Sequence, residues 1–295
     1  MFLKLRVFRK LFLIGVCFLL VAIIVAPLKL LLAIFSQKLA WRFAFYVSRW
    51  VGWSLAAIMG ARLRFLNEEN IPRENGFLVV SNHFGYIELM ATLARLPMVF
   101  VAKEEVKRWP IIGMANRIGG AVFVDRYTGG RSEKYGSMVY DALRNRINVF
   151  FSPEGTTSDG TFIRRFKSPL FVPANRLKVP VLPVVISIDK INGENLNPDN
   201  RDLVTWHSDM KFVLHFLAFL ELKSVDLTIR FLKPTIPDYD DSDLNERRRF
   251  SASIRQQISE VYRELHPGYR EDFQPPEPDF IQEKRRKIRL NGETE

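Results

Sequence analysis

The beginning of the chain carries the feature that most limits how it can fold. Residues 11–26, LFLIGVCFLLVAIIVA, form an uninterrupted apolar run, and residues 28–35 continue it with Lys29 as the one charge. Because a helix needs about 20 apolar residues to cross a bilayer, these stretches together predict a membrane-embedded helical segment. A cleavable signal peptide is the alternative, favoured by the basic residues near the start, but no small-x-small cleavage site follows the run.

A second apolar stretch follows at residues 39–60, LAWRFAFYVSRWVGWSLAAIMG, which is rich in Trp and Phe and includes Arg42 and Arg49. That composition is typical of an interfacial helix or of an imperfect second crossing. The basic residues at the start of the chain favour a cytoplasmic N-terminus, and a second helix is needed to return the chain to that side. We therefore expect a helical hairpin or two half-buried helices, and attachment to the cytoplasmic face of a membrane.

The net charge of +11 belongs mostly to this leader. Residues 1–60 contain eight Lys and Arg and no acidic residue, and removing those eight from the 43 basic residues leaves 35 against 32 acidic residues, a net charge of +3. A nucleic-acid groove needs a concentrated basic face, whereas basic residues around an apolar leader suit anionic lipid headgroups. Membrane lipids are therefore the predicted partners, and nucleic acid is not expected to bind.

From about residue 75 onward, short β-rich runs alternate with helical patterns, which predicts an α/β fold with a mixed sheet flanked by helices. The expected strands cover 76–81, 98–102, 121–124, 148–152, 181–188 and 226–232, and the expected helices cover 86–95, 104–118, 131–146, 168–177 and 211–222. Residues 192–205 have the composition of a loop. We expect an anchor over 1–60, the main domain over 61–270 and a charged tail over 271–295.

A last amphipathic helix is expected near the C-terminus. Asp243 and Glu246 are spaced like a helix-starting cap. The apolar stripe that follows at helical spacing is predicted to be core, and it consists of Phe250, Ile254, Ile258, Tyr262 and Leu265.

His83 directly follows an apolar strand in the segment SNHFGYIE, with Glu88 five residues later. Side chains five apart on an ideal helix point about 140° away from each other, so the pair converges only if His83 lies in the strand-to-helix turn. There, a carboxylate on one imidazole nitrogen would fix the tautomer and leave the other nitrogen as a general base for an alcohol. Taken alone, the spacing favours a helix cap or a polar surface residue over a catalytic pair.

Three further segments contain or end predicted strands: GGAVFVDR at 119–126, FFSPEGTTSDG at 150–160 and VPVLPVVI at 179–186. Loops beyond strand ends form the natural binding crevice of an open α/β sheet. Arg126 is able to make a forked contact with a phosphate, and the main-chain N–H groups of Gly155 and Thr156 can add donors. The structural alternatives are a surface ion pair for Arg126, a plain turn for PEG and core for VPVLP.

Other chemistries lack a candidate in this sequence. No HExxH motif is present, His207, His215 and His266 are not grouped in ligand spacing, and no metal is expected. No GxSxG segment is present to supply a covalent serine. The single cysteine, Cys17, lies in the apolar run, where we expect a small buried residue.

In this order, four blocks resemble the motifs of the glycerolipid acyltransferases of the PlsC or lysophosphatidate acyltransferase type. NHFGYIE is similar to that family's NHxxxxD block, GGAVFVDR to GxxFxDR, SPEGTTS to FPEGTRS and VPVLPVV to VPxxPV. The likeness covers roughly residues 75–235. It implies a glycerol-3-phosphate acyltransferase-like fold on an N-terminal membrane-embedded segment, no metal or prosthetic group, and acyl-CoA or acyl-carrier protein as the co-substrate.

The resemblance also implies roles for individual residues. His83 would remove the proton of the acceptor hydroxyl as its oxygen attacks the thioester, and Glu88 would hold the imidazole. The implied reaction converts 1-acyl-glycerol-3-phosphate to phosphatidate without an acyl-enzyme. The glycerol phosphate would be positioned by Arg126, Glu154, Gly155 and Thr156, assisted by Lys103.

Two positions depart from the family pattern. The usual Asp is Glu88, whose extra methylene group requires a different approach to His83. The Arg of the EGTRS block is Thr157, which leaves the acceptor headgroup open. Alternatives are an acyltransferase for another lysophospholipid or a lyso-amino-acid lipid, and a catalytically silent membrane lipid-binding protein. Candidates to replace the missing charge are Arg164, Arg165 and Lys167.

Overall fold

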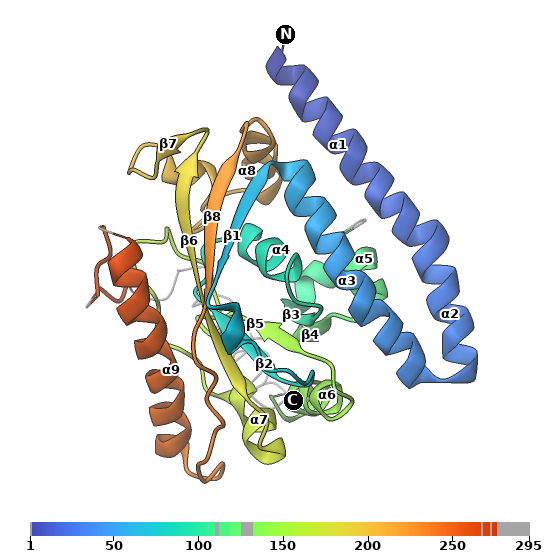
Figure 1. The fold of residues 1–295 in the computed structure, drawn as a ribbon, viewed down its shortest axis with the longest axis vertical. Coiled ribbons are helices and arrows are strands. Elements are labelled where there is room, and N and C mark those ends of the chain that lie inside the picture. Colours follow the sequence, from blue (N-terminus) through green and yellow to red (C-terminus); the bar gives the residue numbers. More distant parts are fainter. Residues whose placement is uncertain (1, 110–111, 125–131, 267, 272, 276–295) are drawn as a thin grey trace, which may run out of the picture.

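An eight-stranded mixed sheet forms the centre of the molecule in a computed structural model that describes residues 2–109, 112–124, 132–266, 268–271 and 273–275 (Figure 1). The strand order is β1-β8-β6-β2-β5-β3-β4, with β7 paired to β6. The strands are β1 (Ala61–Leu66), β2 (Leu78–Ser81), β3 (Val99–Lys103), β4 (Val122–Val124), β5 (Val149–Phe151), β6 (Val181–Ile191), β7 (Glu194–Asn195) and β8 (Val225–Phe231). The predicted α/β class and mixed sheet are confirmed.

The strand directions explain why the sheet is mixed. The five strands β6, β2, β5, β3 and β4 run parallel to one another. Strand β8 pairs antiparallel with β6 and parallel with β1. All six predicted strands are present, but β1 and β7 were not predicted. In β1 the exposed Arg62 and Arg64 alternate with partly buried apolar residues, and β7 has two residues inside the stretch expected to be loop.

Helices cover both faces of the sheet. They are α4 (Ile87–Leu93), α5 (Ile112–Ile118), α6 (Ser132–Arg144), α7 (Val172–Leu177), α8 (Phe212–Leu220) and α9 (Leu244–Leu265), with short 3-10 turns at Glu68–Asn70, Glu104–Arg108, Pro169–Phe171 and Arg201–Leu203. The single helix predicted over 104–118 is wrong. Trp109 has extended backbone angles, φ −70° and ψ 129°, which the residue before a proline prefers.

The core is divided between the two faces of the sheet because side chains alternate along each strand. In β2, Val79 faces the layer that contains α4 and α8, whereas Leu78 and Val80 face the layer that contains α6, α7 and α9. The stripe predicted on α9 is core: Ile254 and Ile258 are fully buried on this second face.

Of the two residues predicted to cap α9, Asp243 does so and Glu246 does not. The Asp243 side chain accepts the Asn245 N–H over 2.7 Å and begins the helix. Glu246 instead accepts the N–H of Asp240 over 2.7 Å, so it fastens the preceding turn and does not complete a capping box.

The leader folds as a helical hairpin (Figure 1). Its first arm is α1 (Phe2–Leu20), a π-helical turn (Val21–Val25) and α2 (Ala26–Phe35), and its second arm is α3 (Gln37–Met59). Ser36 breaks the helix with extended backbone angles and caps α3 by accepting the Leu39 N–H over 3.4 Å. Within the described chain, Lys4–Phe35 is the one helix long and apolar enough to cross a membrane, and 22% of its apolar window is buried.

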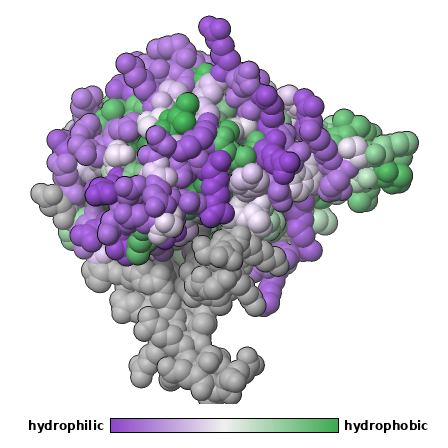
Figure 2. Space-filling view, turned by 90° about the horizontal axis from the view of Figure 1, so that it is seen from below, coloured by the Kyte–Doolittle hydropathy of each residue, from purple (hydrophilic) through white to green (hydrophobic). Residues whose placement is uncertain are grey.

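The hairpin packs on the main domain by its inner side. Gly52 lets α3 approach α4, since a Cβ at this position would lie 2.3 Å from the Cβ of Leu93. Cys17 is buried in the core shared with the sheet, as predicted. The outer side exposes apolar residues along its length, and Figure 2 shows them gathered on the projection that holds the turn between α2 and α3.

Candidate active site

The site lies at the carboxyl ends of β2, β5 and β3, which are parallel neighbours in the sheet. The register pairs Val80 with Phe151, and His83 and Glu154 each stand three residues beyond these partners. Their loops are therefore adjacent. The His83 N–H donates to Glu154 Oε1 over 2.7 Å, and the Ser158 N–H donates to the His83 carbonyl over 2.9 Å.

His83 and Glu88 converge in the way that the spacing requires. β2 ends at Ser81 and α4 begins at Ile87, so His83 lies in the turn between them, where its Nδ1 contacts Glu88 Oε1. Because a carboxylate only accepts hydrogen bonds, Nδ1 carries the proton and Nε2 of the neutral ring is the basic nitrogen. Nε2 has no hydrogen bond to any residue in the described ranges, and 19% of the side chain is exposed.

Glu88 is held in the first turn of α4 and is 1% exposed. The N-terminal end of a helix favours a negative charge, and the second oxygen, Oε2, is buried with no hydrogen bond to the described part of the chain. His83 is consequently the one described partner of the carboxylate.

Glu154 is buried behind the histidine and does not line the cavity beside it. Its two oxygens accept main-chain N–H groups, from His83 over 2.7 Å and from Arg164 over 2.8 Å. Burial raises the pKa of Glu154 to about 8, although these two hydrogen bonds and the Arg164 charge oppose the shift. In this position the Glu154 side chain holds the His83 loop, and its predicted contact with a substrate phosphate stays a prediction.

Gly155 follows in a left-handed conformation, with φ of +77°. This backbone conformation favours glycine, and a Cβ there would lie 2.8 Å from Nζ at the end of the flexible Lys167 side chain. Gly155 does not line the cavity either, whereas its neighbour Thr156 does.

A cavity of about 270 Å³ opens beside the imidazole. Of the residues predicted for the site, it brings together His83, Lys103 and Thr156, while Arg126 lies outside the described residues. In the described part of the chain, no three His, Cys, Asp or Glu side chains are grouped to hold a metal ion. The complete described lining is His83, Lys103, Thr156, Thr157, Trp206, Ser208, Asp209 and Met210.

Half of that lining comes from residues 206–210, which were not predicted as site residues. The Trp206 N–H donates to the carbonyl of Phe84, the residue after His83, over 2.8 Å, and Trp206 Nε1 donates to the Met210 carbonyl over 2.8 Å. The segment TWHSDMKFVLHFL at 205–217 also resembles a stretch of bacterial members of the family, and this likeness is the sequence signal that points to these residues.

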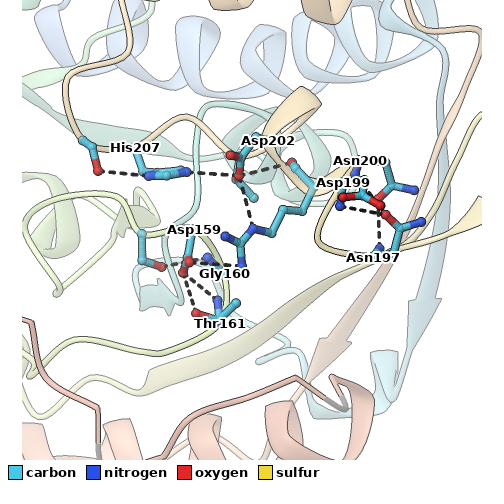
Figure 3. A network of polar contacts seen from close by, with 12 residues as sticks. Asp159, Gly160, Thr161, Asn197, Asp199, Asn200, Asp202 and His207 are labelled. Carbon is cyan, nitrogen blue, oxygen red and sulfur yellow. Dashed lines mark hydrogen bonds and ion pairs between the residues drawn. The ribbon is translucent and has the colours of Figure 1, made fainter.

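A polar network holds this segment against the loop that follows β5 (Figure 3). Arg201 contacts Asp159 over 3.2 Å and donates from Nε to Asp202 over 3.2 Å, and His207 Nε2 lies 3.3 Å from the same Asp202 oxygen. Burial alone would raise the pKa of Asp159, but hydrogen bonds from Thr161 and the charge of Arg201 lower it. The ionised Asp159 thus fastens the two cavity walls together.

A second connection joins the turn between β2 and α4 to α8. His215 Nε2 lies 3.1 Å from the Asp202 carbonyl, which only accepts, so the Nδ1 of the neutral ring accepts from the Tyr86 hydroxyl over 3.2 Å. Burial lowers the pKa of His215 and raises the pKa of Tyr86, which keeps both groups neutral.

Comparison with known proteins assigns the part of the chain that holds His83, Lys103 and Thr156 to a known family. The family model named Acyltransferase matches residues 62–187. The chain is 30% identical over 189 residues to the lyso-ornithine lipid O-acyltransferase of Brucella abortus, covering 61% of this chain and 69% of that protein. It is 31% identical over 215 residues to the protein of the same name from Rhizobium meliloti, covering 69% and 70%.

Two further likenesses are to proteins named as acyltransferases for 1-acyl-sn-glycerol phosphate. The 1-acyl-sn-glycerol-3-phosphate acyltransferase of Neisseria gonorrhoeae is 36% identical over 130 residues, 44% of this chain and 51% of that protein. The crystal structure of PlsC from Thermotoga maritima, a 1-acyl-sn-glycerophosphate acyltransferase, superposes with a TM-score of 0.59 at 20% identity, covering 88% of this chain and 97% of that chain. At this identity, the superposition establishes the fold alone.

Proposed function

Because the chain belongs to the PlsC-type glycerolipid acyltransferase family, we propose that it moves a fatty acyl group from acyl-CoA or acyl-carrier protein to the free hydroxyl of a lysolipid, with His83 as general base. The observation that carries this proposal is the environment of the His83 imidazole ring. His83 Nδ1 is held by the buried Glu88, and the ring borders a cavity large enough for reacting groups.

The reaction follows from that geometry. Nε2 accepts the hydroxyl proton while the acceptor oxygen forms a bond to the thioester carbonyl carbon. Collapse of the tetrahedral intermediate breaks the carbon–sulfur bond, and the leaving thiolate takes the proton back from the imidazolium. Glu88 stabilises the imidazolium between these steps, so no acyl-enzyme, metal or prosthetic group takes part in the proposal.

Other predicted site residues take different proposed roles. Lys103 and Thr156 border the cavity, where they contact the acceptor or the thioester donor. Glu154 is a positioning residue, since it touches the His83 main chain and not the cavity. Arg126 keeps its predicted role as a proposal, which is to contact the phosphate where the acceptor is lysophosphatidate.

Two acceptors are each favoured by a specific observation. Lysophosphatidate is the acceptor that the four blocks predict, and the relative that is 36% identical bears that name. Relatives matched over more of their length, at 30% and 31% identity, are named for lyso-ornithine lipid. The residue that departs from the family block, Thr157, lines the cavity, which makes the headgroup the property to test.

The hairpin determines where the proposed reaction takes place, because it attaches the protein to a membrane. We propose that residues 1–60 form the membrane anchor, 61–270 the acyltransferase domain and 271–295 a charged tail. Exposed Tyr46, Trp50 and Trp53 on α3 suit the interface of a bilayer, and Ile34 and Phe35 at the hairpin turn are 79% and 77% exposed. Embedding this side in the cytoplasmic leaflet lets a lipid acceptor and a water-soluble donor meet at the domain.

The direct test uses the purified full-length protein in lipid–detergent micelles. Labelled acyl-CoA, or acyl-carrier protein loaded with the same chain, is supplied with lysophosphatidate or lyso-ornithine lipid, and products are identified by mass spectrometry. We expect an O-acylated product from at least one acceptor, and none from His83→Ala. If no combination of donor and acceptor gives a product, the proposed function is rejected.

A further inference from the structure

The cavity beside His83 contains a carboxylate that the proposed chemistry does not use. Asp209 lines the cavity, and the structure describes no hydrogen bond or ion pair between its side chain and the residues of the described ranges. Lys103 supplies a positive charge in the same lining, and the remaining side chains there carry no fixed charge, His83 being neutral before proton transfer. The described lining is therefore balanced, with one cation and one anion.

This balance is unsuited to a phosphate monoester. Charges that share a cavity of about 270 Å³ lie within several ångströms of each other, where like charges repel by about 1 kcal/mol or more. The arginine of the family's EGTRS block is replaced here by Thr157, whose hydroxyl adds no further positive charge to this lining. A headgroup that brings its own ammonium group turns the same carboxylate into an attractive partner.

We propose that Asp209 selects the acceptor by binding an ammonium group of its headgroup, and that the acceptor is a lysolipid with an amino-acid headgroup. Such a headgroup carries an ammonium and a carboxylate, which match Asp209 and Lys103. The proposal rests on the proposed acyltransferase function and names its acceptor class. It also accounts for Thr157, because an amino-acid headgroup has no phosphate monoester that needs an arginine.

The segment that carries Asp209 is built to hold a fixed position. Trp206 is bonded to the catalytic turn through the Phe84 carbonyl, and the Trp206 indole is bonded to the Met210 carbonyl, so Asp209 lies inside a closed turn. Asp202 and His207 fasten the same segment from its outer side. A specificity residue requires this kind of support, since a mobile carboxylate discriminates poorly between headgroups.

Kinetics with two acceptors test the proposal. Wild type, Asp209→Asn and a control, Asp199→Asn, are assayed with lyso-ornithine lipid and with lysophosphatidate. Asp199 is an exposed acid nearby in sequence that does not line the cavity. We expect Asp209→Asn to lower kcat/KM for lyso-ornithine lipid about tenfold or more, mainly through KM, and to leave that for lysophosphatidate unchanged or higher. Equal effects on both acceptors, or no effect on either, would overturn the proposal.

Binding to an inactive protein separates this proposal from the proposed function. Equilibrium binding of lyso-ornithine lipid in mixed micelles is measured with His83→Ala and with His83→Ala/Asp209→Asn, because neither needs turnover. We expect about tenfold weaker binding in the double variant and equal melting temperatures for the two proteins. Equal affinity of the two variants, or no binding to His83→Ala, refutes recognition by Asp209. This conclusion does not depend on whether the wild type is active. Weaker binding without wild-type turnover refutes only the acyl transfer.

Discussion

His83 and Glu88 meet because a short turn separates the end of β2 from the start of α4. A one-charge change at Glu88 tests this contact: Glu88→Gln keeps the size and still accepts the Nδ1 hydrogen, but it removes the charge that stabilises the imidazolium. We expect kcat to fall about 100-fold with little change in KM, because Glu88 is buried away from the cavity. Steady-state kinetics decide, and a kcat within twofold of wild type would contradict the role of Glu88.

Glu154 makes stability depend on pH. Burial raises its pKa from 4.5 to about 8, so the folded chain holds this proton more tightly than the unfolded chain. Its contribution to the free energy of unfolding is full below about pH 4.5 and is lost as the pH rises through about 8. Relative to Glu154→Gln, wild type should lose on the order of a few kcal/mol between these limits in denaturant titrations. Parallel pH profiles for the two proteins would be the contrary outcome.

Residue patterns predicted the contact of His83 and Glu88 but not the whole cavity. His83 and Glu88 are five residues apart, and on one continuous helix their side chains would point away from each other. Their contact therefore required a turn at His83, which the structure contains. Glu154 was expected at the substrate, because a motif does not say which face of a loop a side chain takes. Trp206 and Asp209 were missed because they come from a segment more than 100 residues away, and only the packing of Trp206 on Phe84 brings them to the site.

At the scale of elements, Lys10 joins three helices. Its buried ammonium donates to the carbonyl of Met59 at the end of α3 and to that of Leu222 just after α8, each over 2.8 Å. These are carbonyls left unpaired where helices end. We expect Lys10→Met to lower the free energy of unfolding by about 2 kcal/mol, since both buried acceptors lose their donor.

Thermal or denaturant unfolding of the full chain in micelles measures this effect. The matched control is Lys4→Met, which removes the same charge from an exposed position of the same helix. Equal stabilities for the two variants would show that Lys10 does not hold the hairpin on the domain.

Most elements followed from periodicity, and the exceptions have physical causes. Six strands were predicted from short β-rich runs, most of which are continuously apolar, as in strands that are buried on both faces. β1 was missed because Arg62 and Arg64 face outward at the edge of the sheet, so its pattern resembles the end of a polar connection. The helix over 104–118 was divided because Trp109 precedes a proline.

For the whole molecule, the arrangement of hairpin and sheet predicts how the protein meets a bilayer. Ile34→Asp/Phe35→Asp places two charges on the exposed hairpin turn. We expect this variant to lose most of its binding to vesicles that contain anionic lipids, because charges at that depth are costly. Ile236→Asp alters an apolar residue that is 58% exposed outside the hairpin, and it should bind like wild type in vesicle flotation. Equal binding of all three proteins would exclude the hairpin as the anchor.

The strand order lay beyond the reach of sequence patterns. Apolar runs identify strands but not their neighbours, so the pairing of β2 with β5, which sets His83 beside Glu154, emerged from the fold alone. The division of the chain at residues 60 and 270 stays a prediction, since the hairpin shares one core with the sheet.

A double-mutant cycle tests the central claim most directly. Single-turnover acyl transfer to the preferred lysolipid is measured for wild type, His83→Ala, Glu88→Ala and the double variant, with circular dichroism to verify folding. If Glu88 acts through His83, the double variant will be no slower than His83→Ala alone. Acyl transfer at the wild-type rate by folded His83→Ala, or losses that add fully in the double variant, would contradict a base that is held by its neighbouring acid.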